Sequence, residues 1–456
     1  MSDREPGNQN EFMIEKIKQR PINRKKLLRR TILTASMAVI FGLIACFTFL
    51  VLEPVINNWL YPEEEPQVVV FPEDQREMSP EEMLAENLPT ESPAPTEEPV
   101  EESVTLDEDQ IQAILGRVVL SKENYAQLYD GLHSFIYDTE NEPDDTPGLM
   151  QYMVTIRGIS SNVDWFNTVQ ESNSQASGVI IADNGKELLI LVDYSPLKNA
   201  DNLILDLSDG FYQIEVSLKG YDPATNLAVL AVERNSMPVE WMEVGGLNVA
   251  PMGSSNVRDL EGTPVIALGS PMGVEDSVGY GMITASNTFT AVDRNYKLIC
   301  TSIVGSRKAS GVLFNLRGEL IGIITNNKIN SDIGNVINAF GISELKKIVE
   351  RMSNGEKIPY MGITGVDVPS SVYREFNVPY GAYVKDLDMD SPAMLAGIQQ
   401  GDVIIAVNDK VVSSFNDYSA ILMQLESGQT VKLTVMRQAQ AEYKEMNFSI
   451  VLEERG

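Results

Sequence analysis

Histidine and cysteine are nearly absent from this chain of 456 residues, which contains one histidine and two cysteines. A structural zinc site takes three or four ligands from these residue types, and a disulfide scaffold needs several cysteine pairs, so neither is expected. Bases are also scarce: 35 lysines and arginines stand against 65 aspartates and glutamates, which gives a net charge of −30. Because nucleic-acid binding depends on neutralising phosphates, we expect no nucleic-acid partner.

The few bases are concentrated at the N-terminus. Residues 1–30 hold nine bases and four acids, and the next 22 residues carry no charge. A helix of that length spans about 33 Å, enough to cross a hydrocarbon core of ~30 Å. A cleaved signal peptide is the alternative, but its apolar region is shorter and ends at small residues. We therefore predict a basic cytoplasmic tail at 1–30, a single transmembrane helix at 31–52 and an extracytoplasmic remainder.

Two further segments precede the strand-rich part of the chain. Residues 53–110 are rich in glutamate and proline. Repeated X-Pro bonds disfavour helix and like charges repel, so we predict an extended, disordered stalk. Residues 111–148 carry apolar residues at helical spacing and predict a helical lead-in segment.

From residue 149 to residue 342 the apolar runs become short and β-branched, as in GVII, ELLILV and ELIGIIT. About twelve such runs, separated by turn signals and without long helices between them, indicate a mainly β domain built as a barrel or sandwich pair. A helix is predicted over 343–352, within a linker at 343–356. Residues 357–454 form a last compact region of strands with two short helical stretches.

This last region contains SPAMLAGIQQGDVIIAVNDKVV, and YMGI precedes it. The two motifs resemble the PDZ domains of the HtrA/Deg family. The resemblance implies that a peptide adds as a strand and that backbone N–H groups of one loop hold its C-terminal carboxylate. The implied loop consists of Tyr360, Met361, Gly362 and Ile363. The implied second wall of the groove is a helix whose apolar side chains are equally compatible with a core role: Tyr418, Ile421, Leu422 and Leu425.

The strand-rich region resembles the protease domain of the same family, a chymotrypsin-like double β-barrel, through DPATNLAVLAVE and GVLFNLRGELIGIIT. Three positions depart from the family pattern. Ser195 stands where the family has its catalytic histidine, Asn226 where it has the aspartate, and Ala309 where it has the serine. The resemblance thus implies a degenerate triad, with Arg307 and Ala309 at the oxyanion-hole positions.

The scarcity of histidine supports the same interpretation without any alignment. The one histidine, His133, lies in the helical segment before the barrel, whereas a serine nucleophile of this type needs an imidazole beside it. Another nucleophile stays open as an alternative, because Ser310 lies close to Lys308 and Ser–Lys dyads exist. Cys300 is flanked by apolar residues and is predicted to be a buried thiol.

Together these patterns predict a membrane-anchored HtrA-like pseudoprotease that binds polypeptide C-termini or unfolded segments, as a sensor, scaffold or regulator in envelope protein quality control. Two alternatives remain, an active endopeptidase using Ser310 and a structural oligomeric scaffold. No metal and no cofactor are expected. The expected partners are such polypeptides, the membrane through residues 31–52, and either further copies in a homotrimer or an active relative in a hetero-oligomer.

Overall fold

The computed structural model describes residues 28–29, 32–43, 48, 66–74, 122–137, 147–163, 169–207, 212–239, 241, 247–325, 335–376, 378–439 and 442–455. The chain divides into two units, Met1–Glu65 and Pro66–Gly456. Residues 32–43 are helical. Within the described part of the chain, no helix is both long enough and apolar enough to cross a membrane. Outside that part lie residues 31, 44–47 and 49–52 of the predicted span. The same holds for residues 1–27 and 30 of the predicted tail.

The described piece of the predicted stalk, residues 66–74, packs into the folded unit and is not a free spacer. Val69 and Phe71 are each 8% exposed and belong to a core cluster. The N–H and carbonyl of Val69 bond the side-chain amide of Asn354, at 2.9 Å each. The apolar run QVVVF at 67–71 explains the difference, because burying it outweighs the tendency of its acidic neighbours to stay solvated. Residues 53–65 and 75–110 lie outside the described residues.

Helix α4 (Lys122–Tyr137) and the 3₁₀ turn η1 (Leu149–Tyr152) lead into the first sheet. Ile136 on α4 is fully buried, and Leu132 and Phe135 pack against the same core cluster. The apolar spacing that predicts a helix here therefore reflects a face packed on the folded unit. Residues 111–121 and 138–146 of the predicted lead-in lie outside the described part.

The first β unit is an antiparallel sheet with strand order β5-β4-β1-β2-β3-β7-β6. Side chains along β3 alternate between two core clusters, with Leu188 and Ile190 in one and Leu189 and Leu191 in the other. Burial on both faces is why this strand reads as an unbroken apolar run. The strands are β1 (Met153–Val163), β2 (Val169–Asp183), β3 (Glu187–Asp193), β4 (Asn202–Leu207), β5 (Tyr212–Glu215), β6 (Ser217–Asp222) and β7 (Leu227–Glu233).

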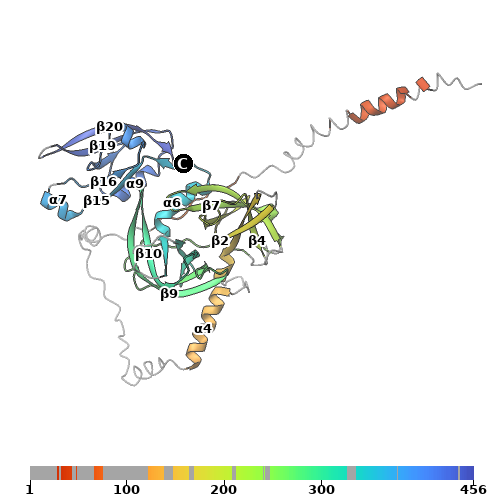
Figure 1. Cartoon of the computed structure of the whole chain (residues 1–456), viewed down its shortest axis with the longest axis horizontal. Helices are drawn as coiled ribbons and strands as arrows, with labels where there is room; N and C mark the ends of the chain where they lie inside the picture. Colours follow the sequence, from red (N-terminus) through yellow and green to blue (C-terminus); the bar gives the residue numbers. More distant parts are fainter. Residues whose placement is uncertain are drawn as a thin grey trace, which may run out of the picture. The chain divides into compact units, whose positions relative to one another are not determined.

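The second β unit is a closed barrel with strand order β10-β13-β12-β11-β8-β9. Two of its strands, β9 and β10, are labelled in Figure 1. Small and β-branched side chains such as Ala267, Ile299 and Ala339 form a separate core cluster. The strands are β8 (Pro264–Ser270), β9 (Ser277–Ala291), β10 (Arg294–Val304), β11 (Ser310–Asn315), β12 (Leu320–Thr325) and β13 (Val336–Gly341). Helix α6 (Ile342–Ser353) follows, where the sequence predicts a helix over 343–352.

The C-terminal region has its own core cluster under a sheet of order β15-β16-β17-β19-β20, with β18 paired to β17 and β14 to β21. Strand β15 is an edge of this sheet, so one side of it is not paired with another strand. Its helices are α7 (Ser370–Phe376), α8 (Pro392–Ala396) and α9 (Phe415–Leu422). Its strands are β14 (Pro359–Tyr360), β15 (Ile363–Asp367), β16 (Ala382–Leu387), β17 (Val403–Val407), β18 (Lys410–Val411), β19 (Thr430–Ala439), β20 (Glu442–Val451) and β21 (Glu453–Glu454).

Candidate functional site

Two of the three positions that the resemblance assigns to the catalytic triad lie next to each other, where β3 ends and β7 begins. The N–H of Tyr194 donates to the carbonyl of Asn226 at 2.8 Å, which places Ser195 and Asn226 on adjoining turns. Asn226 has a left-handed backbone with φ of 59°, a conformation that asparagine tolerates better than most residues. Its side-chain oxygen accepts the Tyr221 hydroxyl at 3.0 Å. An amide in this place offers no carboxylate to orient a base.

Ser195 binds a buried carboxylate. Its N–H and its hydroxyl both donate to Oδ1 of Asp193, at 2.9 and 2.6 Å. Asp193 is 6% exposed. Burial raises the pKa of its carboxyl above the ordinary value, and the hydrogen bonds from Ser195 act in the opposite direction. A serine hydroxyl is not a base near neutral pH, so Ser195 can support Asp193 but cannot take the imidazole's role.

Ala309, at the predicted nucleophile position, places a methyl group in a closed turn. Ala309 is 3% exposed, and its N–H donates to the carbonyl of Ser306 at 3.2 Å. In the same turn the N–H of Lys308 donates to the Ser306 hydroxyl at 3.1 Å. One of the two implied oxyanion-hole donors therefore already has a partner within its own loop. Arg307, the other implied position, is exposed and does not adopt a left-handed backbone.

Ser310, the alternative nucleophile, is buried in a cluster of serines between β2, β8 and β11. It is 4% exposed, and its hydroxyl oxygen accepts the N–H of Ser177 at 3.4 Å. The hydroxyls of Ser177 and Ser270 lie 2.9 Å apart. Lys308 is exposed, and no hydrogen bond within the described residues joins its amine to Ser310. The geometry thus lacks the desolvated lysine that a Ser–Lys dyad needs.

The histidine and the cysteine singled out in the sequence lie away from the predicted catalytic positions. His133 is exposed on α4, with its ring centroid 4.9 Å from that of Tyr137. Cys300 is 6% exposed on β10, its Sγ lies 2.9 Å from the side-chain oxygen of Asn338, and burial raises the pKa of its thiol. Both placements match the sequence-based expectations of a helix-face histidine and a core thiol. Cys46 lies outside the described residues.

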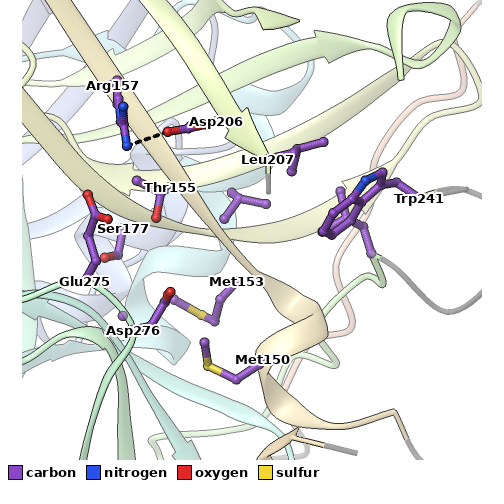
Figure 2. A pocket seen from close by; sticks show the side chains of 13 residues that line it. Met150, Met153, Thr155, Arg157, Ser177, Asp206, Leu207, Trp241, Glu275 and Asp276 are labelled. Atoms are coloured by element: carbon purple, nitrogen blue, oxygen red, sulfur yellow. Dashed lines mark ion pairs between the residues drawn. The ribbon is translucent and has the colours of Figure 1, made fainter. Parts of the chain in front are cut away.

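A pocket of about 260 Å³ lies between the first sheet and the second barrel, as Figure 2 shows. Its charged lining includes an ion pair between Arg157 and Asp206, at 2.6 Å, together with the carboxylates Glu275 and Asp276. Ser177 links this pocket to the serine cluster, but the described residues that line it include none of the three substituted catalytic positions. The pocket is therefore separate from the predicted catalytic positions within the described residues.

The loop predicted to hold a carboxylate, residues 360–363, does surround one in this structure. The N–H groups of Met361 and Gly362 donate to Oδ2 of Asp293 at 2.8 Å each, and the N–H of Ile363 donates to Oδ1 at 2.9 Å. Tyr360 lies apart from this set, with its side chain directed to Asp388 at 2.9 Å. The sequence analysis missed Asp293, which comes from the β9–β10 turn of the barrel.

The predicted groove wall on α9 is largely core. Tyr418, Ile421 and Leu422 are buried in the C-terminal cluster, and Leu425 packs against it partly exposed. Tyr418 also reaches the loop, where its hydroxyl donates to Oδ1 of Asp293 at 2.8 Å. Burial, followed by the nearby Asp293 charge, raises the pKa of Tyr418 well above its ordinary value. The hydroxyl is therefore a lasting hydrogen-bond donor at this loop.

Comparison with known proteins gives two matching families. A family model described as a PDZ domain matches residues 359–450, and one described as a trypsin-like peptidase domain matches residues 176–323. A probable periplasmic serine endoprotease, DegP-like, from Halomonas elongata is 30% identical over 277 residues, or 59% of this chain and 55% of that protein. Its counterpart from Pseudomonas putida is 28% identical over 280 residues, or 59% and 54%. The solved structure of the HtrA-type protease AlgW with decapeptide is 21% identical and covers 67% of this chain and 96% of that one, at a TM-score of 0.48.

The chain therefore contains a trypsin-like peptidase domain followed by a PDZ domain, and it is similar to DegP-like proteins over 59% of its length. The predicted mainly β fold with these two kinds of domain is confirmed. The chain spans about half the length of the curated relatives it matches. The chemical state of the catalytic positions, and the roles of the predicted site residues, stay predictions.

Proposed function

We propose that this chain is a polypeptide-binding pseudoprotease. Its PDZ domain binds C-termini or unfolded segments of extracytoplasmic proteins, and its trypsin-like domain does not cleave them. The observation that carries the proposal is the nucleophile turn, where Ala309 has no hydroxyl and its N–H is bonded to Ser306. Serine catalysis needs a hydroxyl, a base and an oxyanion hole in one place. The chain's one histidine, exposed on α4, supports the same conclusion.

The proposal includes a location and a role. The relatives are named periplasmic, which supports an extracytoplasmic position for the folded unit, and the apolar segment 31–52 is its proposed single membrane anchor with the N-terminus in the cytoplasm. A binding protein held at the membrane can act as a sensor, a scaffold or a regulator of an active relative. Either a homotrimer or a hetero-oligomer with that relative is compatible with these roles.

An active serine endopeptidase is the second candidate, and the names of the relatives, which are serine endoproteases, favour it over the pseudoprotease. In this chain it requires Ser310 to act as the nucleophile. The placement of Ser310 argues against that role, because its hydroxyl is buried and already accepts a backbone N–H from Ser177. The purely structural scaffold remains a third candidate, with no peptide preference expected.

The test compares cleavage and binding in one preparation of the full chain in detergent micelles. We expect no release of fragments from fluorescent casein, with the DegP-like protein of Halomonas elongata as the active control. We expect retention of peptides with free C-terminal carboxyls and not of the same peptides amidated. Casein cleavage that the Ser310→Ala substitution removes would establish the endopeptidase instead. Equal retention of free and amidated peptides would favour the structural scaffold.

A further inference from the structure

The turn between β9 and β10 carries a carboxylate in an unusual environment. The two strands pair up to Ala291 and Arg294, so the turn consists of Val292 and Asp293. An aspartate with a left-handed backbone is ordinary in such a hairpin turn, and Asp293 has φ of 63°. Hairpin turns, however, usually face solvent, whereas Asp293 is 0% exposed. A buried carboxylate must be compensated by hydrogen bonds.

The compensation comes entirely from the PDZ domain. Asp293 accepts four hydrogen bonds there, three from consecutive backbone N–H groups of residues 361–363 and one from the Tyr418 hydroxyl. The backbone of the turn adds a fifth, because the N–H of Asp293 donates to the carbonyl of Ile363 at 2.6 Å. Ile363 is the first residue of the edge strand β15.

These contacts reproduce how a PDZ domain holds the end of a peptide. A bound C-terminus places its carboxylate against consecutive loop N–H groups, and its backbone begins a ladder on the edge strand. Asp293 supplies both parts, with its side-chain carboxylate in the loop and its own N–H as the first rung on β15. The two oxygen positions cannot hold a second carboxylate at the same time.

We propose that Asp293 is an internal ligand of the PDZ domain, so that a peptide C-terminus binds only when the β9–β10 turn leaves the loop. This inference rests on the proposed peptide-binding function and adds its regulation. It makes the barrel a competitor for the binding site: any change in the barrel that withdraws the turn raises the apparent affinity for peptide. The apparent dissociation constant exceeds the intrinsic one by the reciprocal of the undocked fraction.

Neighbouring residues bias this equilibrium in both directions. The guanidinium of Arg455 donates to the carbonyl of Val292 at 2.9 Å and holds the turn in place. Arg294, directly after Asp293, is 3% exposed, and its three guanidinium nitrogens have no hydrogen-bond partner within the described residues. A buried, unpartnered guanidinium is unfavourable, and undocking would return it to water. The docked state thus combines the fully hydrogen-bonded carboxylate of Asp293 with the buried, unpartnered guanidinium of Arg294. One favours docking and the other favours undocking, as expected of an element with two accessible states.

The experiment measures peptide affinity and loop protection in the full chain. The probes are fluorescent decapeptides with free carboxyl termini ending in Val, Leu, Ile or Phe, read by fluorescence anisotropy. Asp293→Asn cannot match three N–H donors with one amide oxygen, and Asp293→Gly keeps the left-handed turn without a carboxylate, which protects the test against a folding defect in either variant. We expect both to bind at least about tenfold more tightly than the unmodified chain. Asp259→Asn, at an exposed left-handed turn of the same barrel, is the matched control and should leave the affinity unchanged.

Amide hydrogen exchange without peptide separates this inference from the proposed function. We expect residues 361–363 to exchange slowly in the unmodified chain and at least about tenfold faster in both Asp293 variants. That result supports the internal ligand even if no probe binds, in which case the peptide-binding function alone fails. Fast exchange of residues 361–363 in the unmodified chain, or equal peptide affinity with and without Asp293, would overturn the internal ligand.

Discussion

Two loops of this molecule correspond to places where related folds hold negatively charged oxygen with backbone N–H groups, and they differ in what those groups do. In the barrel, the N–H of Ala309 turns back to the carbonyl of Ser306. In the PDZ domain, the N–H groups of Met361, Gly362 and Ile363 converge on one carboxylate. In the first loop the N–H at the predicted oxyanion-hole position is bonded within its own turn. In the second loop three N–H groups bind the side-chain carboxylate of Asp293.

The difference shows which properties of a domain depend on the catalytic residues. The barrel closes and packs mainly through alternating apolar side chains, and Ala309, at the predicted nucleophile position, belongs to that packing. A small apolar residue at this position is therefore compatible with a closed, packed barrel. Anion binding depends instead on the direction of a few backbone N–H groups, which one turn can change. A fold match alone consequently says little about whether the barrel can cleave.

The largest expected effect is a loss of stability in the PDZ domain. Asp402 is 1% exposed and accepts two hydrogen bonds from Arg437, at 2.7 Å each. Asp402→Ala leaves the guanidinium without its carboxylate, so we expect the free energy of unfolding of the PDZ domain to fall by about 3–5 kcal/mol. Urea unfolding of the full chain measures it. The control is Asp409→Asn, which removes the charge of an exposed ion pair with Lys432 and keeps a residue that tolerates the left-handed backbone, so stability should change by less than about 1 kcal/mol.

The second effect concerns the carboxylate loop itself. A Cβ added at Gly362 would lie 2.2 Å from that of Ser391, at a backbone φ of +88°. Gly362→Ala should therefore destabilise the PDZ domain by about 2–4 kcal/mol, from strain and overpacking together. Gly428 has φ of +85° with no atom within 4 Å, so Gly428→Ala isolates the backbone strain, at about 1 kcal/mol. Equal losses in the two variants, measured by urea unfolding, would refute the close packing at Gly362.

A pH-dependent effect tests the new role of Ser195 in the barrel. Burial raises the pKa of Asp193, and the Ser195 hydroxyl favours its ionised form. Ser195→Ala should cost about 2 kcal/mol above that raised pKa, where Asp193 is ionised. As the pH falls through it, both proteins protonate Asp193 and the difference shrinks. The check is urea unfolding at pH 8 and pH 4.

Ser236→Ala serves as the control for that prediction. The Ser236 hydroxyl donates to the neutral carbonyl of Glu233 at 2.6 Å on an exposed turn. Its small contribution should not vary with pH in this range. A Ser195→Ala loss that is equally independent of pH would contradict the assigned contact with the ionised Asp193.

The smallest expected effect is the most informative about catalysis. Ala309→Ser restores the hydroxyl of the family pattern in a buried position, and we expect a stability change of about 1 kcal/mol. Casein cleavage by the variant should stay at the buffer rate, because neither Ser195 nor Asn226 can accept a proton from that hydroxyl. Measurable cleavage by Ala309→Ser would mean that a base near the site has been overlooked.

Local patterns account for where some residues of the candidate barrel site lie. The turns that hold Ser195 and Asn226 follow from the ends of two apolar strands, and these strands pair in the structure. The buried environment of Cys300 follows from its apolar neighbours, whereas the charged neighbours of Ala309 give no sign of its burial. The hydrogen bonds of these residues could not be predicted from the sequence. The bond from the Ala309 N–H to the Ser306 carbonyl, for example, depends on the conformation of one turn.

Two long-range features escaped the sequence analysis. Asp293 reads as an ordinary hairpin-turn aspartate, and nothing near it in the sequence indicates a partner about 70 residues away. Residues 66–74 lie within acidic, proline-rich sequence, and this composition predicts a solvated segment. The short apolar run QVVVF within them indicates burial instead, and Val69 and Phe71 are buried. Both depend on packing between segments far apart in the chain, which periodicity and spacing do not report.

The central claim, that this barrel lacks a working serine nucleophile, is tested most directly by intact-mass analysis of the full chain after incubation with a fluorophosphonate. The reagent forms a covalent adduct only with a hydroxyl that the protein activates. We expect the mass to remain that of the unmodified chain, while an active DegP-like protein in the same tube is labelled completely. A single adduct that maps to Ser310 and disappears in Ser310→Ala would contradict the account.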